Sequence, residues 1–141
     1  MRQALHQLRV ETRGKGLVEI TRDVAAFVSR EAISTGLLTL FCRHTSASLL
    51  IQENADPDVQ KDLAAFFERI APENRALYAH EAEGPDDMPA HIKAMLTTTS
   101  LSVPVTGGRL VLGTWQAIYV VEHRDRARER EVFLHYQGTL R

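Results

Sequence analysis

The stretch Leu37–Glu53 reads LLTLFCRHTSASLLIQE and predicts two buried strands with a polar segment between them. Its first part, Leu37–Arg43, is mostly apolar and β-prone, as a central strand would be, and Ser48–Gln52 predicts a second, shorter strand. The segment between the two strands begins with His44 and continues with two hydroxyl residues. Polar residues at a strand end either cap the strand or bind a ligand, and the stretch alone leaves both interpretations open.

The residues before this stretch predict a hairpin followed by a helix. Leu5–Glu11 alternates in polarity, the two glycines within residues 13–16 suit a turn, and Leu17–Ile20 predicts the return strand. Apolar residues share one helical face from Thr21 onward, and threonine is a residue type that caps helices. Gly36 is placed to close this helix in a left-handed conformation.

A second helix is predicted after the quoted stretch. Asp56 can cap its first turn, and Pro57 at the first helical position loses no hydrogen bond. We expect this helix to pack firmly on a sheet and to end at Pro72. The apolar residues within this helix are spaced at i, i+4, i+7, i+8 and i+11 and form one stripe: Val59, Leu63, Phe66, Phe67 and Ile70.

An acidic segment with two histidines comes next. Glu73–Asp87 predicts a long loop that holds His80 among carboxylates, and such a loop in a compact domain is usually functional or mobile. Asp87 is expected to cap a short third helix whose first turn contains Pro89. That start places His91 in the first turn of the helix.

The last third of the chain predicts β-structure. The alternating residues 101–105 predict a strand, residues 107–108 a turn, Leu110–Glu122 one long strand and Arg130–Tyr136 the final strand. No internal repeat or linker divides the chain, so residues 1–141 predict a single domain. The order of elements predicts an α+β fold with a mostly antiparallel sheet and the helices on one face.

The composition excludes several classes of function. The formal net charge is −1 over 141 residues. A chain with this charge lacks the positive field that non-specific nucleic-acid binding needs. Cys42 is the only cysteine, so neither an intrachain disulfide nor a cysteine zinc cluster can form. The first residues offer no secretion signal, and no apolar run is long enough to span a bilayer. We therefore expect a cytoplasmic protein with neither nucleic acid nor membrane as partner.

Three histidines are the strongest candidates for chemistry: His44, His80 and His91. Their spacing matches no standard zinc pattern, because His80 and His91 are 11 positions apart and His44 is remote from both. Three neutral imidazoles nevertheless suit Zn²⁺ with an open fourth position, and nearby carboxylates could orient them. Imidazoles with hydroxyls could equally bind phosphate, and a solvated or core histidine is the commoner outcome.

Other conspicuous residues have a structural interpretation beside the functional one. Trp115 is expected within a strand, where core packing is a commoner role than stacking on a ligand. The arginines of residues 124–130, interleaved with acids, predict a solvated hairpin tip, with an anion site as the alternative. Cys42 predicts an inert buried thiol, and Ser46 lacks the Gly-x-Ser-x-Gly elbow of a hydrolase. The remaining histidines, His6, His123 and His135, are interpreted as structural.

Five blocks of the sequence together resemble the signatures of the YjbQ-like family. They occur in matching order over nearly the whole chain, and five multi-residue blocks are more specific than any one of them. The blocks are His44-Thr45-Ser46-Ala47-Ser48, Gln52-Glu53-Asn54-Ala55-Asp56-Pro57-Asp58, His80-Glu81-Ala82-Glu83-Gly84, Asp86-Asp87-Met88-Pro89-Ala90-His91-Ile92-Lys93 and Leu112-Gly113-Thr114-Trp115-Gln116.

The resemblance implies a compact α+β fold with a small barrel-like sheet, assembled as a homotrimer. It also implies that His44, His80 and His91 gather in a metal or anion pocket. The family is also known as secondary thiamine-phosphate synthase, and weak activity of that kind is attributed to it without a settled cellular role. This chain has Ala117 where the pattern usually has glycine, which is expected to narrow any pocket beside Trp115.

The first functional hypothesis, implied by the resemblance, is a transferase that joins a pyrimidine methyl diphosphate to a thiazole phosphate. The site must neutralise phosphate charge as diphosphate leaves, through a cation and oriented donors. Zinc at the three histidines is the expected cofactor, with magnesium as the alternative for a diphosphate substrate, and a phosphorylated small molecule is the expected partner. We expect Glu53 and Asp87 to act in catalysis, and Thr45, Ser46, Asn54, Trp115 and Gln116 to contact substrate.

Two alternatives stay open at this point. One is metal-assisted hydrolysis of a small phosphorylated metabolite, for which Glu53 is the best candidate for the base. The other is a trimeric scaffold that holds a metal or a phosphorylated ligand without turnover. The sequence does not separate them, because the residues around the ligand would be alike in each case.

Overall fold

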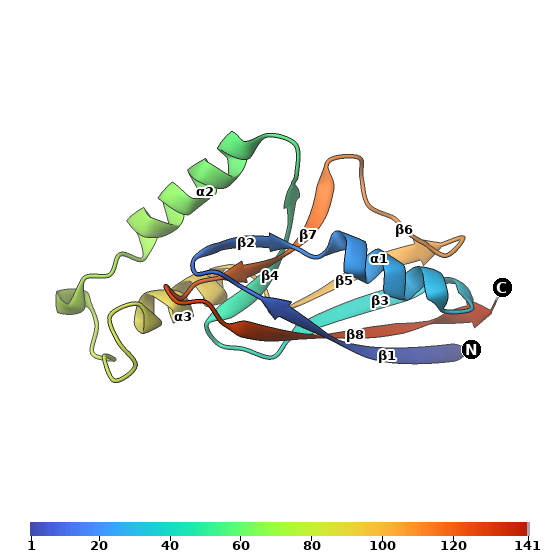
Figure 1. Cartoon of the computed structure of the whole chain (residues 1–141), viewed down its shortest axis with the longest axis horizontal. Coiled ribbons are helices and arrows are strands. Elements are labelled where there is room, and N and C mark those ends of the chain that lie inside the picture. Colours follow the sequence, from blue (N-terminus) through green and yellow to red (C-terminus); the bar gives the residue numbers. More distant parts are fainter. Residues whose placement is uncertain (141) are drawn as a thin grey trace.

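The computed structural model describes residues 1–140, and Figure 1 shows the arrangement of its strands and helices. The first half contains β1 (Arg2–Glu11), β2 (Gly16–Glu19), α1 (Thr21–Arg30), β3 (Ile33–Cys42), β4 (Ala47–Glu53) and α2 (Pro57–Ile70). The second half contains a 3-10 turn η1 (Arg75–Leu77), α3 (Asp87–Leu96), β5 (Ser100–Thr106), β6 (Arg109–Leu110), β7 (Gln116–Glu122) and β8 (Glu129–Leu140).

The strands form two antiparallel sheets. The larger has the order β1-β8-β3-β5-β6, and the smaller has the order β2-β7-β4. β3 lies at the centre of the larger sheet, where Leu40 pairs with Leu134 of β8 on one side and Leu101 of β5 on the other. The prediction of a central strand at Leu37–Arg43 is therefore confirmed.

Both sheets curl around one hydrophobic core. Leu38 and Leu134 of the larger sheet, Leu49 and Val120 of the smaller sheet, and Phe27 of α1 are all buried in it. The predicted α+β fold with a barrel-like antiparallel sheet is confirmed. Within residues 1–140, no helix has both the length and the apolar character to cross a membrane.

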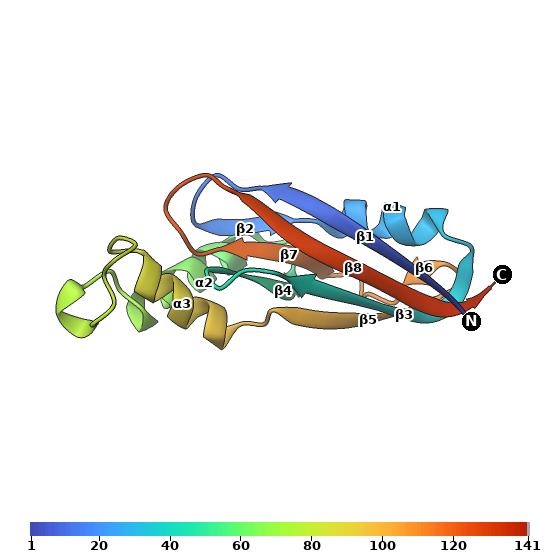
Figure 2. The same cartoon turned by 90° about the horizontal axis from the view of Figure 1, so that it is seen from below.

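The predicted N-terminal hairpin is wrong, because β1 and β2 belong to different sheets. β1 pairs with β8 over its whole length, as Figure 2 shows, and β2 pairs with β7. The alternating pattern identified both strands, but the long β8 offers β1 ten paired residues where the short β2 could offer four. Residues 12–15 therefore carry the chain from one sheet to the other.

The ends of α1 also differ from the prediction. The helix begins at Thr21, but the Thr21 hydroxyl accepts a hydrogen bond from the Ile118 backbone N–H and does not cap the first turn. Gly36 does not end the helix; it lies in β3, opposite Gly138 of β8. A Cβ at Gly36 would lie 2.1 Å from the Gln137 carbonyl oxygen, so the two strands approach too closely there for a side chain.

α2 begins as predicted but does not pack as predicted. Asp56 caps the helix by accepting a hydrogen bond from the Asp58 backbone N–H at 2.9 Å, and Pro57 is the first helical residue. None of the helix residues is buried, and Figure 1 shows α2 standing away from the strands. The apolar stripe is real but only partly covered, because Phe67 packs edge-on against His123 while Phe66 and Ile70 are exposed.

The predicted long strand at Leu110–Glu122 is broken. The two-residue β6 is followed by an irregular segment, and pairing resumes only at Gln116 in β7. Trp115 lies in that irregular segment and is 62% exposed, so it is neither a strand residue nor a core residue. The Gln116 side chain accepts a hydrogen bond from the Gly113 backbone N–H at 2.8 Å, which stabilises the turn before β7.

Candidate metal centre

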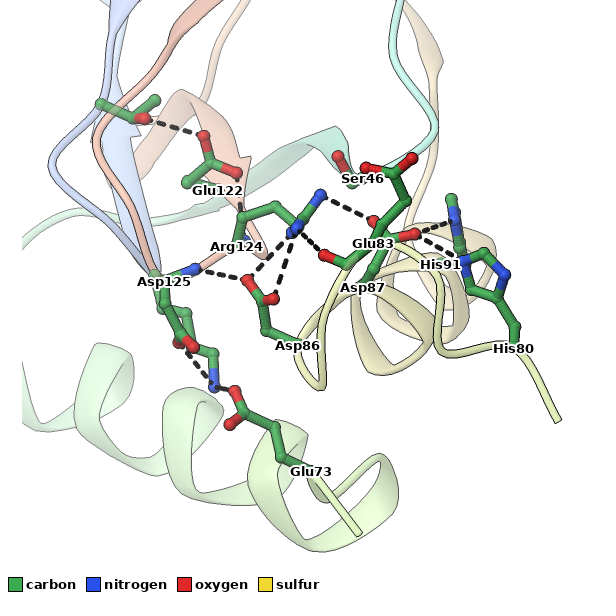
Figure 3. Close-up of polar contacts among 12 residues, drawn as sticks. Ser46, Glu73, His80, Glu83, Asp86, Asp87, His91, Glu122, Arg124 and Asp125 are labelled. Atoms are coloured by element: carbon green, nitrogen blue, oxygen red, sulfur yellow. Dashed lines mark hydrogen bonds and ion pairs between the residues drawn. The ribbon is translucent and has the colours of Figure 1, made fainter. Parts of the chain in front are cut away.

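Two histidines and one carboxylate meet at the start of α3. His80 lies in the loop before the helix, Asp87 is the first helical residue and His91 follows four residues later. Asp87 Oδ2 lies 2.8 Å from His80 Nε2 and 2.9 Å from His91 Nε2 (Figure 3). His91 is thus one turn beyond Asp87 and not in the first turn, and the i, i+4 spacing places both side chains on one face.

The hydrogen bonds of His91 determine its tautomer. Its Nδ1 lies 2.9 Å from the Thr45 carbonyl oxygen, which can only accept, so Nδ1 carries a proton. In the neutral ring Nε2 then presents a lone pair to Asp87 Oδ2, which is also an acceptor. Two acceptors at 2.9 Å are favourable only when a second proton on the ring or a bound cation lies between them.

The second oxygen of Asp87 is held by Arg124. The Arg124 Nη1 donates to Asp87 Oδ1 at 2.8 Å, and Asp87 is only 4% exposed. Burial raises the pKa of Asp87, but the neighbouring rings of His80 and His91 and the positive charge of Arg124 lower it by more. The pKa of Asp87 is therefore held below its ordinary value, and the carboxylate is ionised at neutral pH.

Arg124 is itself locked by Asp86. Its Nε donates to Asp86 Oδ2 at 2.9 Å, and its Nη2 donates to the Glu83 backbone carbonyl at 2.8 Å. Burial raises the pKa of Asp86, but the hydrogen bonds from Arg124 and from the Asp125 backbone N–H lower it to about 2. The buried guanidinium connects the loop after β7 to the first turn of α3 and orients Asp87.

The donor set fits a divalent cation with an open coordination position. His80, Asp87 and His91 each offer one ligand atom, and the three atoms lie within 4.8 Å of one another. Two imidazoles and one carboxylate suit zinc, which holds its ligands about 3.3 Å apart in a tetrahedral site. The side chains of His80 and His91 are 40% and 32% exposed, so a further position faces solvent.

His44 lies outside this group of ligand atoms within a single chain. Its Nε2 accepts a hydrogen bond from the Glu131 backbone N–H at 2.8 Å, and its Nδ1 lies 3.3 Å from Arg130 Nη1. Burial and the positive charge of Arg130 lower the pKa of His44, so the ring is neutral at pH 7. Within one chain, Asp87 therefore takes the third position that was expected for His44.

Thr45 and Ser46 are close to the centre but have structural partners. Thr45 orients His91 through its backbone carbonyl and not through its hydroxyl. Ser46 is buried, and its hydroxyl oxygen accepts a hydrogen bond from Arg130 Nη2 at 3.0 Å. Their predicted contact with a substrate stays a prediction.

The other expected site residues lie at the opposite end of β4. Glu53 is eight residues beyond Thr45, which corresponds to about 26 Å of extended chain. It pairs with Gln116 of β7, and its carboxylate accepts a hydrogen bond from the Asp56 backbone N–H at 3.3 Å. The Asn54 backbone N–H donates to the Trp115 carbonyl at 3.1 Å. These four residues form a second group, separate in one chain from the histidines.

Comparison with known proteins identifies the family. The family model described as UPF0047 protein YjbQ-like matches residues 6–139. The chain belongs to the YjbQ-like family. A UPF0047 protein of Synechocystis, sll1880, is 51% identical over 99% of this chain and 95% of its own length. The UPF0047 protein YjbQ of Escherichia coli O157:H7 is 44% identical over 93% of this chain and 94% of its own length.

Solved structures of similar proteins share the fold. A conserved hypothetical protein of Thermus thermophilus, TT1486, is 40% identical and superposes with a TM-score of 0.82 over 92% of this chain and 97% of its own. An uncharacterised YjbQ/UPF0047 protein of Clostridium acetobutylicum is 36% identical, with a TM-score of 0.83 over 95% of this chain and 99% of its own.

Sequence reasoning missed two residues that hold this YjbQ-like centre together, Arg124 and Asp86. Arg124 was expected at a solvated tip because acids and arginines alternate around it, yet it is 8% exposed. Asp86 lies in the predicted acidic loop and in one of the five family blocks, but no role of its own is predicted for it. A signal was available, since the adjacent carboxylates Asp86 and Asp87 at a helix start need cationic partners when they are buried.

Proposed function

We propose that His80, Asp87 and His91 bind a divalent cation, with zinc as the best match, and that the chain uses this centre on a phosphorylated small molecule. The hydrogen bonding of His91 carries the proposal, because it leaves a ring lone pair facing an ionised carboxylate. A backbone carbonyl on the far ring nitrogen is also the usual partner of a metal-binding histidine, since it fixes the ring and its tautomer.

Different residues would bind the cation and orient its ligands at this centre. A bound cation would supply positive charge to phosphate oxygens as negative charge develops on them. Arg124 holds Asp87 Oδ1 and leaves Oδ2 as the ligand atom, and Thr45 holds His91. His80 has the most exposed side chain of the three, so a substrate approaches from its side.

A transferase that forms thiamine phosphate from a pyrimidine methyl diphosphate and a thiazole phosphate is the first reaction we propose for this centre. The resemblance described above implies it, and an ionised carboxylate between two partly exposed imidazoles could hold a cation that stabilises the departing diphosphate. Metal-assisted hydrolysis and ligand binding without turnover are the alternatives that the same centre allows.

We further propose that the chain assembles as a homotrimer. The apolar stripe of α2 supports this, because Phe66 and Ile70 are 46% and 45% exposed on a helix without a buried residue. A catalytic role for Glu53 at the histidines would also require a second copy of the chain, because Glu53 and the histidines lie at opposite ends of β4 in one copy. Light scattering that showed a stable monomer at micromolar concentration would contradict the trimer.

Zinc titration of untagged, EDTA-treated protein tests the centre. We expect one zinc ion per chain, with at least tenfold weaker binding after His91→Ala or Asp87→Asn. His135→Ala is the matched control, because its ring bonds to the Gln3 side chain of β1 and is not among the three ligand residues. A folded wild-type protein that bound no zinc, magnesium or manganese would show that the ring of His91 is protonated and that no metal centre exists.

Two further measurements separate the remaining alternatives. His44→Ala should leave zinc binding unchanged if one chain builds the centre, and should weaken it if a neighbouring copy brings its His44. Wild type and His91→Ala are then assayed for thiamine-phosphate formation and for release of phosphate from small phosphate esters. Turnover by wild type that His91→Ala retains in full would assign the activity to another site.

A further inference from the structure

We propose that a second site, on the other side of Arg124 from the histidines, binds the phosphate group of a small molecule through Arg126 and Arg128. This site, which we call the arginine groove, has a volume of about 490 Å³. It is lined by Glu83, Gly84, Pro85, Asp86, Arg124, Asp125, Arg126 and Arg128. It rests on the proposed function only in the choice of a phosphorylated ligand, because binding itself needs no metal.

Two of the three carboxylates that line the groove, Asp86 and Asp125, already have a cationic partner, although Lys15 also pairs with Glu68 and Glu73. Asp86 is bound by the Arg124 guanidinium and by the Asp125 backbone N–H. The Asp125 carboxylate lies 3.3 Å from Lys15 Nζ. Arg124 is in turn occupied by Asp86 and Asp87, and within residues 1–140 no ion pair joins Asp86 or Asp125 to Arg126 or Arg128.

Arg128 is the residue that points to a missing ligand. Its Nε is buried and has no hydrogen-bond partner among residues 1–140, and its guanidinium makes no ion pair with that part of the chain. Leaving a buried charged donor unpaired costs free energy that a bound anion would recover. The backbone on either side of this group is fixed, because the Arg128 N–H donates to Thr12 Oγ1 and its carbonyl accepts from the Thr12 N–H.

Arg126 supplies the second cation. It is exposed, lines the same groove and makes no ion pair within residues 1–140. Two unpaired guanidiniums in one concave site match a phosphate dianion, because each can donate two parallel hydrogen bonds to a pair of its oxygens. Glu83 is the one lining carboxylate without a side-chain partner in the described residues, and its like charge opposes an anion.

Isothermal titration of the full, EDTA-treated chain with inorganic phosphate, diphosphate and ribose 5-phosphate, at constant ionic strength, tests the groove. We expect saturable binding of at least one probe, weakened about tenfold or more by Arg126→Gln or Arg128→Gln. Arg22→Gln, on the exposed face of α1, is the charge-matched control and should change nothing. Glu83→Gln removes the opposing charge and should tighten binding.

The pattern among the probes identifies the source of the phosphate group. Equal affinity for inorganic phosphate and ribose 5-phosphate would assign the groove to free phosphate, and tighter binding of the ester would assign it to a phosphorylated metabolite. Absence of binding by folded wild type, or equal weakening by Arg22→Gln and Arg126→Gln, would overturn the proposal. Zinc binding is measured separately. Absence of phosphate binding at the arginine groove therefore does not contradict the metal centre, and absence of zinc binding does not contradict the groove.

Discussion

His123 should make the chain lose stability as the pH falls below neutrality. It is 2% exposed, its Nε2 lies 2.9 Å from Ser48 Oγ, and its ring packs edge-on against Phe67. The pKa of His123 is lowered from 6.5 to about 4, first by burial and then by the positive charge of Lys93, which outweighs the opposing effect of Glu122. The folded chain therefore keeps this ring neutral where the unfolded chain would protonate it.

The magnitude follows from the two pKa values. The unfolded chain takes up the proton as the pH falls through 6.5, and the folded chain takes it up only near pH 4. The contribution of neutral His123 to the free energy of unfolding is complete above pH 6.5. It is lost between pH 6.5 and pH 4 and changes no further below pH 4. At about 1.4 kcal/mol per pH unit, the whole window corresponds to about 3 kcal/mol, of which about 2 kcal/mol is lost by pH 5.

Urea unfolding followed by far-ultraviolet circular dichroism, at one protein concentration and with EDTA present, measures this loss. His123→Gln is the comparison, since its amide can still bond Ser48 but does not titrate. The free energy of unfolding of wild type should fall about 2 kcal/mol more than that of the variant between pH 7 and pH 5. Parallel pH profiles for the two proteins would refute the assignment, because His123 is the one ionisable group in which they differ.

Three further changes test other parts of the structure. Arg124→Gln should weaken zinc binding about 10- to 100-fold, because Asp87 loses the donor that orients it, and unchanged zinc affinity would contradict that positioning role. Asp56→Ala should reduce the free energy of unfolding by about 1 kcal/mol through loss of the α2 cap, measured by urea unfolding. Gly36→Ala should destabilise the chain by more than Asp56→Ala, because its Cβ would collide with the β8 backbone, and a neutral effect would refute the close approach.

Local features were predicted from the sequence and long-range pairings were not. The start of α2 follows from Asp56 and Pro57, and the alternation in β1 identifies it as a strand, because these signals lie within a few residues. The partner of β1 is β8, more than 110 residues away, and no local pattern specifies it. Likewise, the stripe on α2 indicates that the helix has an apolar face, but not which surface covers that face.

The candidate site divides in the same way. Asp87 and His91 lie four residues apart on one helix, so their meeting could be predicted from their spacing. His80 was expected there from the family resemblance, and the described geometry places it beside both. The adjacent carboxylates Asp86 and Asp87 indicate that a cation must lie near, but not that it is Arg124. Alternating arginines and acids look alike whether they are solvated or buried, and the approach of α3 to the loop after β7 decides which they are.

The pairing of β8 has a consequence for the order in which the molecule folds. β8 occupies the position between β1 and β3, so the larger sheet cannot close until nearly the whole chain has left the ribosome. Contacts between residues so distant in sequence also make folding slow, because a long loop must close before they form. Arg124 arrives with this late segment, whereas His80, Asp87 and His91 are synthesised earlier. The nascent chain therefore carries the three proposed ligands before the guanidinium that orients Asp87, so the proposed cation could reach them first.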